Sequence, residues 1–482
     1  MREQVQINYK PYIFFTPGND DQFEAILDLT RAVHGEGAAA LSRSLYAGMP
    51  GMHREDWYGL ARPDDWPDGM RAPARVVSTL CRIPTGWTCR DVGVNAHLPS
   101  AELGMVASAR DARGCGLSSW LMKRFQADSI KAGFSLSTIQ GIPYFYRRFG
   151  YEYAVPLIPK ILLHPGLVAA KAWSVEASSQ EKQVTEMMES GSRRAIETDI
   201  PLMSAWFNEV SSSLGIRADR SDVHWLYLMG KAQLSFETAV ERRILLDGAG
   251  KPVGWLGFQR DCFGPTMAIA EASLPDLHTG WSAVDMLALA ESIRIEEGMP
   301  HITVLLPRSH PLAIAAAGLG GQLCREYAWQ VAILDRPDFF GRLRPVLEAR
   351  LRSSVLKGGV HTLSLDLYGE NLRFDWDGKR LEITQLSDPT PAEGPDGQEG
   401  TGQEGTGQAT DQSQGQPEDG IDTMPEKPVS AFPPELLGPL ALGYRSWQEL
   451  GHCRRDVMIR PEDRAFMDVL FPVMDSFIYP LF

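Results

Sequence analysis

The chain has 482 residues, of which 44% are hydrophobic and 22% are charged. This length exceeds one ordinary core and the composition is typical of soluble globular proteins, so we expect two or three domains and exclude a disordered or membrane-embedded chain. The formal net charge is −14, but ten carboxylates lie between Asp388 and Glu426, where no Lys or Arg occurs, so the rest carries only about −4. Such a chain lacks the clustered basic surface that binding of nucleic acid requires.

Six cysteines occur without a CxxC pair, which indicates a reducing, cytoplasmic environment and no disulfide framework. No apolar run of 18 residues exists, so we expect no membrane span. His301 and His310 do not have the spacing of metal ligands on a helix, and we expect no metal.

The segment PGMHREDWYG is the first with chemistry that suits a cationic substrate. It carries His53, Glu55, Asp56 and Trp57, and carboxylates beside an aromatic face favour an amine. A solvated surface loop is the alternative interpretation.

The order strand, Gly-rich turn, helix, strand follows between residues 101 and 139. AELGMVAS predicts a strand, ARDARGCG a loop, LSSWLMKRFQADSIKAG a helix and FSLSTI another strand. A Gly-rich turn that opens a helix presents free backbone N–H groups and the positive end of the helix dipole, which together bind a pyrophosphate. Gly114 and Gly116 allow close approach of the backbone, and Arg113 adds charge. An aromatic, Arg-rich string, IPYFYRRFGYEYA, follows this turn and contains Tyr146.

The middle of the chain predicts a second α/β unit. RRILLDGAGKPVGWLGFQR indicates a hairpin around Asp247 to Gly250, a helix is expected near 283–295, and a strand is expected at 302–306. The polar stretch between Leu163 and Arg194 places the boundary before this unit.

Alternating apolar residues predict an antiparallel meander from about 361 to 384. The Gly- and Gln-rich acidic stretch at about 388–427 should be a disordered insertion, because it has almost no apolar area to bury. PPELLGPLALG and PEDRAFMDVLF then begin like helices.

The turn and the aromatic string together resemble the GNAT acetyltransferase superfamily, whose cofactor loop has the pattern (Q/R)xxGx(G/A). The matching positions are Arg113, Gly116 and Ser118, of which Ser118 departs from the usual Gly or Ala. The resemblance implies acetyl-CoA as cosubstrate. It implies the following cofactor-binding residues: Met105, Val106, Ala107, Ser108, Arg113, Gly114, Cys115, Gly116, Leu117 and Ser118.

In that superfamily the first Tyr of a string similar to FYRRFGYE protonates the departing thiolate, which makes Tyr146 the expected general acid. Tyr144, Tyr151 and Tyr153 are its competitors. Glu102, at the start of the strand before the loop, is one expected base, because other GNAT enzymes often place a carboxylate there.

The whole layout resembles the Eis (enhanced intracellular survival) family. This implies an α/β (α+β) fold with a catalytic GNAT domain at 1–165, a degenerate GNAT domain at 166–336 and a sterol-carrier-protein-like domain at 337–482. In this family the terminal carboxylate, here that of Phe482, reaches the first domain's site as general base. The family also implies a homo-oligomer, with six subunits expected.

We therefore expect an N-acetyltransferase that moves acetyl from acetyl-CoA directly to a small-molecule primary amine. Two alternatives stay open at this point. One is an acyltransferase that modifies protein lysines or uses longer acyl chains, and the other is a non-catalytic module that binds acyl-CoA or lipid.

Overall fold

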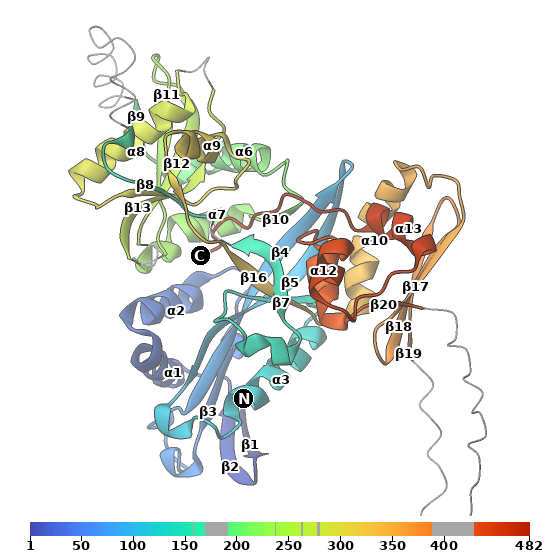
Figure 1. The fold of residues 1–482 in the computed structure, drawn as a ribbon. Coiled ribbons are helices and arrows are strands. Elements are labelled where there is room, and N and C mark those ends of the chain that lie inside the picture. Colours follow the sequence, from blue (N-terminus) through green and yellow to red (C-terminus); the bar gives the residue numbers. More distant parts are fainter. Residues whose placement is uncertain (158, 169–190, 237, 262–263, 277–279, 388–428) are drawn as a thin grey trace, which may run out of the picture.

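The computed structural model describes residues 1–157, 159–168, 191–236, 238–261, 264–276, 280–387 and 429–482. The chain forms three groups of elements, each built on its own β-sheet, and the C-terminus lies where the first and middle groups meet (Figure 1). Helices and strands are both abundant and the sheets are mixed, so the predicted α+β class is confirmed. The insertion expected at about 388–427 lies outside the described residues.

The first sheet holds the predicted phosphate-binding unit. Its strands are, in spatial order, β1 (Arg2–Ile7), β2 (Lys10–Phe15), β3 (Trp57–Ala61), β4 (Ser78–Asp91), β5 (Val94–Ser108), β6 (Leu136–Ile139), β16 (Tyr327–Ile333) and β7 (Glu152–Leu157), and β10 (Ile216–Ala218) pairs with β4. The helices of this group are α1 (Asp20–His34), α2 (Glu36–Gly48) and α3 (Leu117–Lys131).

Helix α1 shows why these segments fold locally. Asn19 caps its first turn by accepting a hydrogen bond from the backbone N–H of Gln22 at 3.0 Å. Phe23, Ile26 and Leu27 are buried at helical spacing, so one apolar face of the helix packs into the core.

The second sheet has the order β15 (Gln322–Leu323), β8 (Ile161–Leu163), β14 (Ile302–Val304), β13 (Pro265–Ala272), β12 (Pro252–Asp261), β11 (Glu241–Leu246) and β9 (Ser192–Arg194). The helices α6 (Ile200–Val210), α7 (Asp222–Met229), α8 (Ala283–Glu296) and α9 (Pro311–Gly318) belong to this part of the chain. The predicted hairpin and the predicted helix near 283–295 are both present.

Three described strands pair outside the sheet of their own part of the chain, and β10, which pairs with β4 of the first sheet, is one of them. Strand β16 comes from the middle of the chain, yet it pairs antiparallel with β6 and β7 of the first sheet. Strand β8 lies before the expected boundary at residue 165, yet it pairs with β14 and β15 of the second sheet. The boundaries at 165 and 336 thus stay a prediction. Pairing crosses the boundary at 165 in both directions, because β8 joins the second sheet and β10 and β16 join the first.

The third sheet contains the predicted meander of β17 (His361–Asp366), β18 (Glu370–Trp376) and β19 (Leu381–Ser387), with β20 (Ser430–Ala431) parallel to β17. The helices around it are α10 (Arg336–Arg352), α11 (Leu437–Ala441), α12 (Trp447–Cys453) and α13 (Arg464–Leu470). Helix α10 contacts β4 and β5 of the first sheet and β19 of the third, so it joins the two groups. Within the described ranges, no helix is both long and apolar enough to cross a bilayer.

Candidate active site

Strand β5 separates from its neighbour in the middle of the first sheet. It pairs with β4 over nearly its whole length, whereas its pairing with β6 in the described structure covers only Ser100, Ala101 and Glu102. Beyond Glu102 the edge of β5 that faces β6 is therefore open. Peptide groups along such an edge are free to bind an extended ligand.

A bulge distorts β5 at the start of this open edge. The register with β4 shifts between Thr79 and Cys81, and Met105 has a φ of 52°, a conformation that non-glycine residues seldom adopt. The ring of His34, at the end of α1, donates from Nε2 to the carbonyl oxygen of Val106 at 2.9 Å. Such strain persists where the surrounding structure holds it, and it is common at functional sites.

The Gly-rich turn forms a cradle at the start of α3. Gly114 and Gly116 have φ values of 77° and 80°, and Gly116 occupies the N-cap of α3 without a capping side chain. Asn8, which lies between β1 and β2, fixes the Gly-rich turn, because its Nδ2 donates to the carbonyl oxygen of Cys115 at 2.9 Å. The first N–H groups of α3 are thus left for an anion.

A cavity of about 500 Å³ lies over this cradle. The cations on its wall are Arg113, from the turn, and Arg148, which stacks on the ring of Phe145 at 4.3 Å. Ser118 also lines it, and its hydroxyl shares a 2.9 Å hydrogen bond with that of Ser108. Two guanidinium groups beside a helix N-terminus favour a phosphate ligand.

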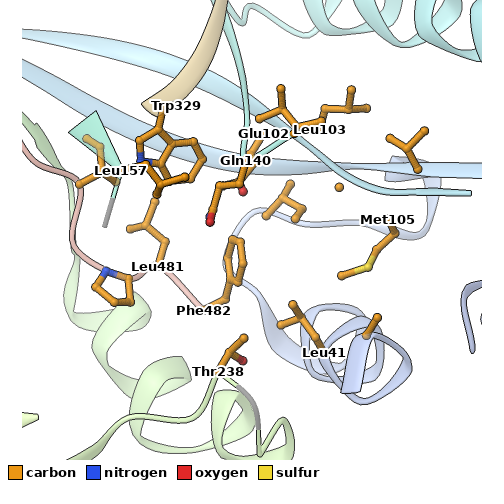
Figure 2. A pocket seen from close by; sticks show the side chains of 18 of the residues that line it. Leu41, Glu102, Leu103, Met105, Gln140, Leu157, Thr238, Trp329, Leu481 and Phe482 are labelled. Carbon is orange, nitrogen blue, oxygen red and sulfur yellow. The ribbon is translucent and has the colours of Figure 1, made fainter. Parts of the chain in front are cut away.

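A larger cavity of about 730 Å³ adjoins the first. Figure 2 shows its wall, with Glu102, Leu103 and Met105 from β5, Leu41 from α2 and Trp329 from the exchanged strand β16. Thr238, Gln259 and Asp261 of the middle part of the chain also line it, as do residues 477–482. The cavity is therefore assembled from distant parts of the sequence.

Tyr146 lines both cavities, together with Val106 and Ile142. It belongs to the short 3-10 helix η4 (Phe145–Phe149) and is only 6% exposed. Burial raises the pKa of its phenol to about 12, so the phenol is protonated at neutral pH. A side chain at Gly141 would overlap the ring, since a Cβ there would lie 2.3 Å from the Tyr146 ring.

Glu102 is the carboxyl group at the β5 side of the larger cavity. It is 4% exposed, and desolvation raises its pKa to about 8, although a hydrogen bond from Gln140 acts in the opposite direction. Gln140 lies next to it in Figure 2. At neutral pH Glu102 is largely protonated, and it ionises slightly above that pH.

The C-terminal tail reaches the same cavity and is held by the middle part of the chain. The N–H of Gly215 donates to Asp475 O at 2.6 Å, and the N–H of Phe477 donates to Ile216 O at 3.0 Å. Further along, Arg220 donates to the carbonyl oxygen of Pro480. With the tail held in this way, the ring of Phe482 lies inside the cavity (Figure 2).

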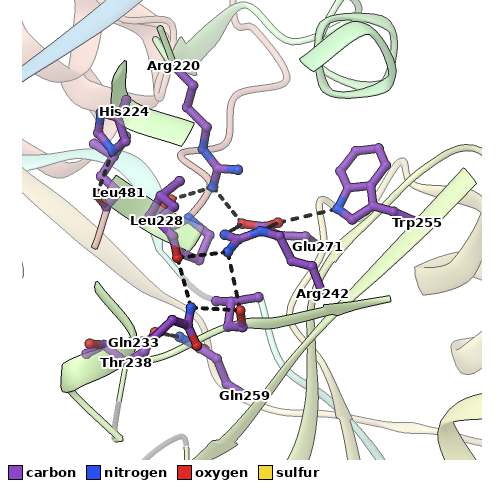
Figure 3. A network of polar contacts seen from close by, with 12 residues as sticks. Arg220, His224, Leu228, Gln233, Thr238, Arg242, Trp255, Gln259, Glu271 and Leu481 are labelled. Carbon is purple, nitrogen blue, oxygen red and sulfur yellow. Dashed lines mark hydrogen bonds and ion pairs between the residues drawn. The ribbon is translucent and has the colours of Figure 1, made fainter. Parts of the chain in front are cut away.

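A buried ionic network supports this end of the tail (Figure 3). Glu271 binds Arg220 at 2.8 Å and Arg242 at 2.7 Å, and all three side chains are at most 1% exposed. Burial alone would raise the pKa of Glu271, but the two guanidinium groups outweigh it and lower the pKa to about 2.

Next to this network, the ring of His224 bonds from Nε2 to the carbonyl oxygen of Leu481 at 2.7 Å. Desolvation and Arg220 lower the pKa of His224 to about 4, so its neutral ring must donate from Nε2.

Comparison with known proteins decides the class of reaction. Residues 16–154 match the family described as Acetyltransferase (GNAT) domain. The chain is an acyltransferase. No curated protein matches the sequence. The match covers the separated strand, the cradle and Tyr146, and the GNAT fold supports an acyl-CoA cosubstrate and an acceptor for the acyl group.

Solved structures share the fold of the whole acyltransferase at low sequence identity. A GCN5-related N-acetyltransferase from Anabaena variabilis is 12% identical with a TM-score of 0.61, and the match covers 98% of this chain and 100% of that one. A probable N-acyltransferase from Enterococcus faecalis is 15% identical with a TM-score of 0.60, over 97% and 99% of the two chains. Eis1 from Mycobacterium abscessus is 12% identical with a TM-score of 0.54, again over 97% and 99%. These values establish a common arrangement of all three groups of elements.

The acyltransferase brings most of the predicted cofactor residues together. The open edge and the cradle line the two cavities through these residues: Met105, Val106, Ala107, Ser108, Arg113, Gly114, Gly116, Leu117 and Ser118. Cys115 does not line either cavity, and its carbonyl group is used by Asn8.

Among the four tyrosines considered as acid, Tyr146 alone lines the described cavities. Tyr144 is 80% exposed, and the hydroxyl of the fully buried Tyr151 bonds to that of Ser137 at 2.6 Å. Tyr153 packs edge-on against Tyr327, whose hydroxyl donates to Gly141 O.

The segment from His53 to Trp57 lies elsewhere. Asp56 binds Arg82 and caps the N–H of His53 at 2.7 Å, and Trp57 is fully buried against Phe23. None of His53, Glu55, Asp56 and Trp57 lines either described cavity, so the acceptor role expected for them finds no support. Asp56 and Trp57 contribute to the local fold, and the acceptor role of the four residues stays a prediction.

Sequence reasoning missed several residues that line or support the cavities. Arg148 lies within the aromatic string, but the motif pattern does not include it, and His34 reaches β5 from the end of α1, far away in sequence. Trp329 reaches the site through the strand exchange, and Arg220 and His224 reach it through contacts with the tail. No local pattern signals such long-range contacts.

Proposed function

We propose that the chain is an N-acetyltransferase that moves acetyl from acetyl-CoA to a primary amine by direct attack. One observation carries this proposal. Tyr146 lies where a cavity suited to the phosphates of CoA meets a cavity open to an acceptor. A phenol at this junction would lie within reach of the sulfur that leaves during acetyl transfer.

The cofactor end of the proposal uses the cradle and the open edge of β5. The diphosphate of CoA would lie on the N–H groups at the start of α3, beside Arg113 and Arg148. The pantetheine arm would follow Met105 to Ser108, where β5 is not paired with β6. A peptide N–H at the bulge would then face the thioester oxygen and stabilise the oxyanion that forms during attack.

The chemical step needs a base and an acid. The base takes a proton from the acceptor ammonium, the free amine attacks the thioester carbon, and the tetrahedral intermediate collapses by breaking the C–S bond. As the C–S bond breaks, Tyr146 gives its proton to the departing sulfur, and the nitrogen, which is cationic after attack, releases its second proton. That second proton restores the phenol of Tyr146, and the base returns the first one to solvent. A phenol with a raised pKa is a weak donor, so its transfer must be concerted with cleavage of the C–S bond.

For the base we propose the terminal carboxylate of Phe482. The support is the docked tail, whose ring enters the cavity and whose last carbonyl groups are held by Arg220 and His224. A terminal carboxyl has an ordinary pKa of about 3.3–3.7, so it requires a partly desolvated site or a water relay to take the proton. Glu102 is the second candidate, and burial has already raised its pKa to about 8.

For the whole chain we propose the Eis-like organisation, with a catalytic GNAT domain at 1–165, a degenerate GNAT domain at 166–336 and a sterol-carrier-protein-like domain at 337–482. The match to Eis1 over 97% of this chain supports the arrangement. The middle domain has no (Q/R)xxGx(G/A) loop between Gly254 and Leu289, so it should bind no CoA. A cytoplasmic homo-oligomer, with six subunits expected, belongs to the same proposal, and light scattering measures its size.

Release of free thiol from acyl-CoA tests the function. The purified chain is assayed with acetyl-, butyryl- and palmitoyl-CoA against a panel of amines and a lysine peptide. We expect amine-dependent release that is fastest with acetyl-CoA and a small amine. A preference for palmitoyl-CoA or for the peptide would replace the substrate assignment, and binding of acetyl-CoA without release of thiol with any amine would refute the proposal.

A further inference from the structure

One side chain joins helix α1 to the distorted part of β5. His34 is the last residue of α1, and its Nε2 donates to the carbonyl oxygen of Val106 at 2.9 Å. A carbonyl oxygen only accepts, so the ring must carry a hydrogen on Nε2. Gly35 ends α1 directly after this residue, with a φ of 94° and its N–H bonded to the carbonyl oxygen of Arg31 at 3.0 Å. The position of the ring is therefore set by the end of the helix.

This bond lies where the two cavities meet. His34 lines the larger cavity, and Val33, the residue before it, lines the smaller one. Val106, whose carbonyl group His34 binds, lines both cavities, as Tyr146 does. The last turn of α1 therefore borders the place where the thioester of a bound acyl-CoA would lie.

The bonded carbonyl group belongs to the bulge of β5. Met105 and Val106 have no partner in the register that the structure describes between β5 and β4. The strand is tied to β4 again at Ala107, whose carbonyl oxygen accepts from Ser78 Oγ at 3.1 Å. A residue left out of a ladder is free to turn, and Met105 keeps its positive φ only where its neighbours are held. His34 supplies such a hold from α1.

Fixing this carbonyl group fixes more than one atom. A peptide group is planar, so the direction of its carbonyl oxygen also sets the direction of the N–H that follows. The bond from His34 thus orients the whole peptide group between Val106 and Ala107. A misplacement of about 1 Å at a reacting group can cost roughly 10²-fold in rate, so a small rotation of this peptide would affect catalysis.

We propose that His34 is a positioning residue for acyl transfer, which holds the bulge of β5 through the carbonyl group of Val106 in the shape that binds the thioester oxygen. The imidazole acts as a fixed hydrogen-bond donor, and it neither takes nor gives a proton in the reaction. This inference rests on the proposed acetyl transfer and adds a residue of α1 to its site.

Substitution of His34 tests this role, because the donor can be kept or removed. Gln carries an N–H at the ε position, as His does, whereas the N–H of Asn lies one atom closer to the backbone and Leu has none. At saturating acetyl-CoA we expect kcat to fall at least tenfold in His34→Leu and His34→Asn, and His34→Gln to turn over at least tenfold faster than His34→Leu. Calorimetry should show less than a threefold change in the affinity for CoA in all three variants, because the cradle holds the diphosphate.

His452→Leu is the matched control, since His452 is an exposed histidine in the last turn of α12. It should leave kcat and the affinity for CoA unchanged. Wild-type kcat in His34→Leu would overturn the inference. A His34→Gln protein as slow as His34→Leu would also overturn it, because the imidazole itself would then be required. If His34→Leu does not fold, His34→Asn serves for the same comparison.

A measurement without turnover separates this inference from the proposed function. The infrared band of the carbonyl group of bound acetyl-CoA, isotopically labelled in that group, moves to lower frequency when a hydrogen bond polarises the thioester. We expect a lower frequency in the wild type and in His34→Gln than in His34→Leu. The same frequency in all three proteins overturns the positioning role, even where acetyl transfer occurs. A band that depends on His34 without turnover of any amine supports the positioning role and refutes acetyl transfer instead.

Discussion

Tyr146 shows what a single residue can contribute when its surroundings exclude water. Its phenol is buried at the junction of the two cavities, next to a glycine that no larger residue could replace. The same burial that keeps the phenol protonated also makes it depend on a concerted transfer. The role that we propose for Tyr146 thus depends on its position more than on its acidity.

Tyr146→Phe removes the proton but keeps the ring, so it should lower kcat by 10²- to 10⁴-fold and leave the affinity for acetyl-CoA unchanged. Release of free thiol measures kcat, and calorimetry measures the affinity for acetyl-CoA. Tyr144→Phe is the matched control, because Tyr144 belongs to the same segment and is 80% exposed. Turnover within threefold of wild type would remove Tyr146 from the mechanism.

Glu102 should leave a signature in the pH dependence of stability. Its pKa is about 8 in the folded protein and ordinarily 4.5, so between these values the folded protein holds a proton that the unfolded chain has lost. Stability conferred by this proton is therefore present at low pH and is lost as the pH rises to about 8. The full loss is on the order of 3–5 kcal/mol.

Glu102→Gln removes this dependence, so the variant's Tm relative to wild type should rise steadily from pH 5 to pH 8. Differential scanning fluorimetry across that range measures it, with the exposed Glu296→Gln as control. A difference in Tm that stays constant with pH would contradict the assigned burial.

At the scale of elements, the turn before α3 was well predicted because its information is local. Arg113, Gly114 and Gly116 were expected at a phosphate, and the structure gives both glycines positive φ at an uncapped helix start. The bulge at Met105 could not be foreseen, because it depends on a register shift against β4. Nor could the sequence show that Asp56 pairs with Arg82 and that Trp57 packs against Phe23, because these partners are distant in the chain.

Gly116→Ala should weaken CoA binding at least tenfold, since a Cβ there would lie 2.7 Å from Asn8 Nδ2 and disturb the turn. Gly133→Ala is the control, because Gly133 has a similar φ of 85° and nothing within 4 Å of its Cβ position. Both variants should lose roughly 1–2 kcal/mol of stability from the backbone alone. Equal CoA affinity in the two variants would show that the cradle does not hold the cofactor.

Arg220→Met should release the C-terminal tail. Glu271 would keep its ion pair with Arg242, but the carbonyl oxygen of Pro480 would lose its donor. Exchange of amide hydrogens in residues 475–482 should therefore accelerate. We also expect kcat to fall at least tenfold, while the affinity for CoA is retained. Arg193→Met is the control, because it breaks an ion pair with Asp199 that makes no contact with the tail and in which Arg193 is 40% exposed. If Arg220→Met misfolds, His224→Phe tests the bond to Leu481 O instead. If amide hydrogen exchange in the tail accelerates while kcat stays at the wild-type value, the tail takes no part in catalysis.

At the scale of the whole molecule, the fold class and the acyltransferase activity could be predicted from the sequence, because the periodicity of each segment and one local motif carry them. The exchange of β16 and β8 could not, since a strand's pattern does not reveal which sheet it joins. This exchange brings Trp329 into the wall of the larger cavity, and the tail brings Phe482. The larger cavity thus depends on the assembly of distant segments, whereas the turn before α3 is formed by one short segment.

A crystal structure with bound CoA tests the central claim most directly, because it locates phosphate and sulfur in one measurement. We expect the diphosphate on the N–H groups of Gly114 to Ser118 and the sulfur within hydrogen-bonding reach of the Tyr146 hydroxyl, at about 3–4 Å. CoA bound away from the cradle, or with its sulfur remote from Tyr146, would contradict it.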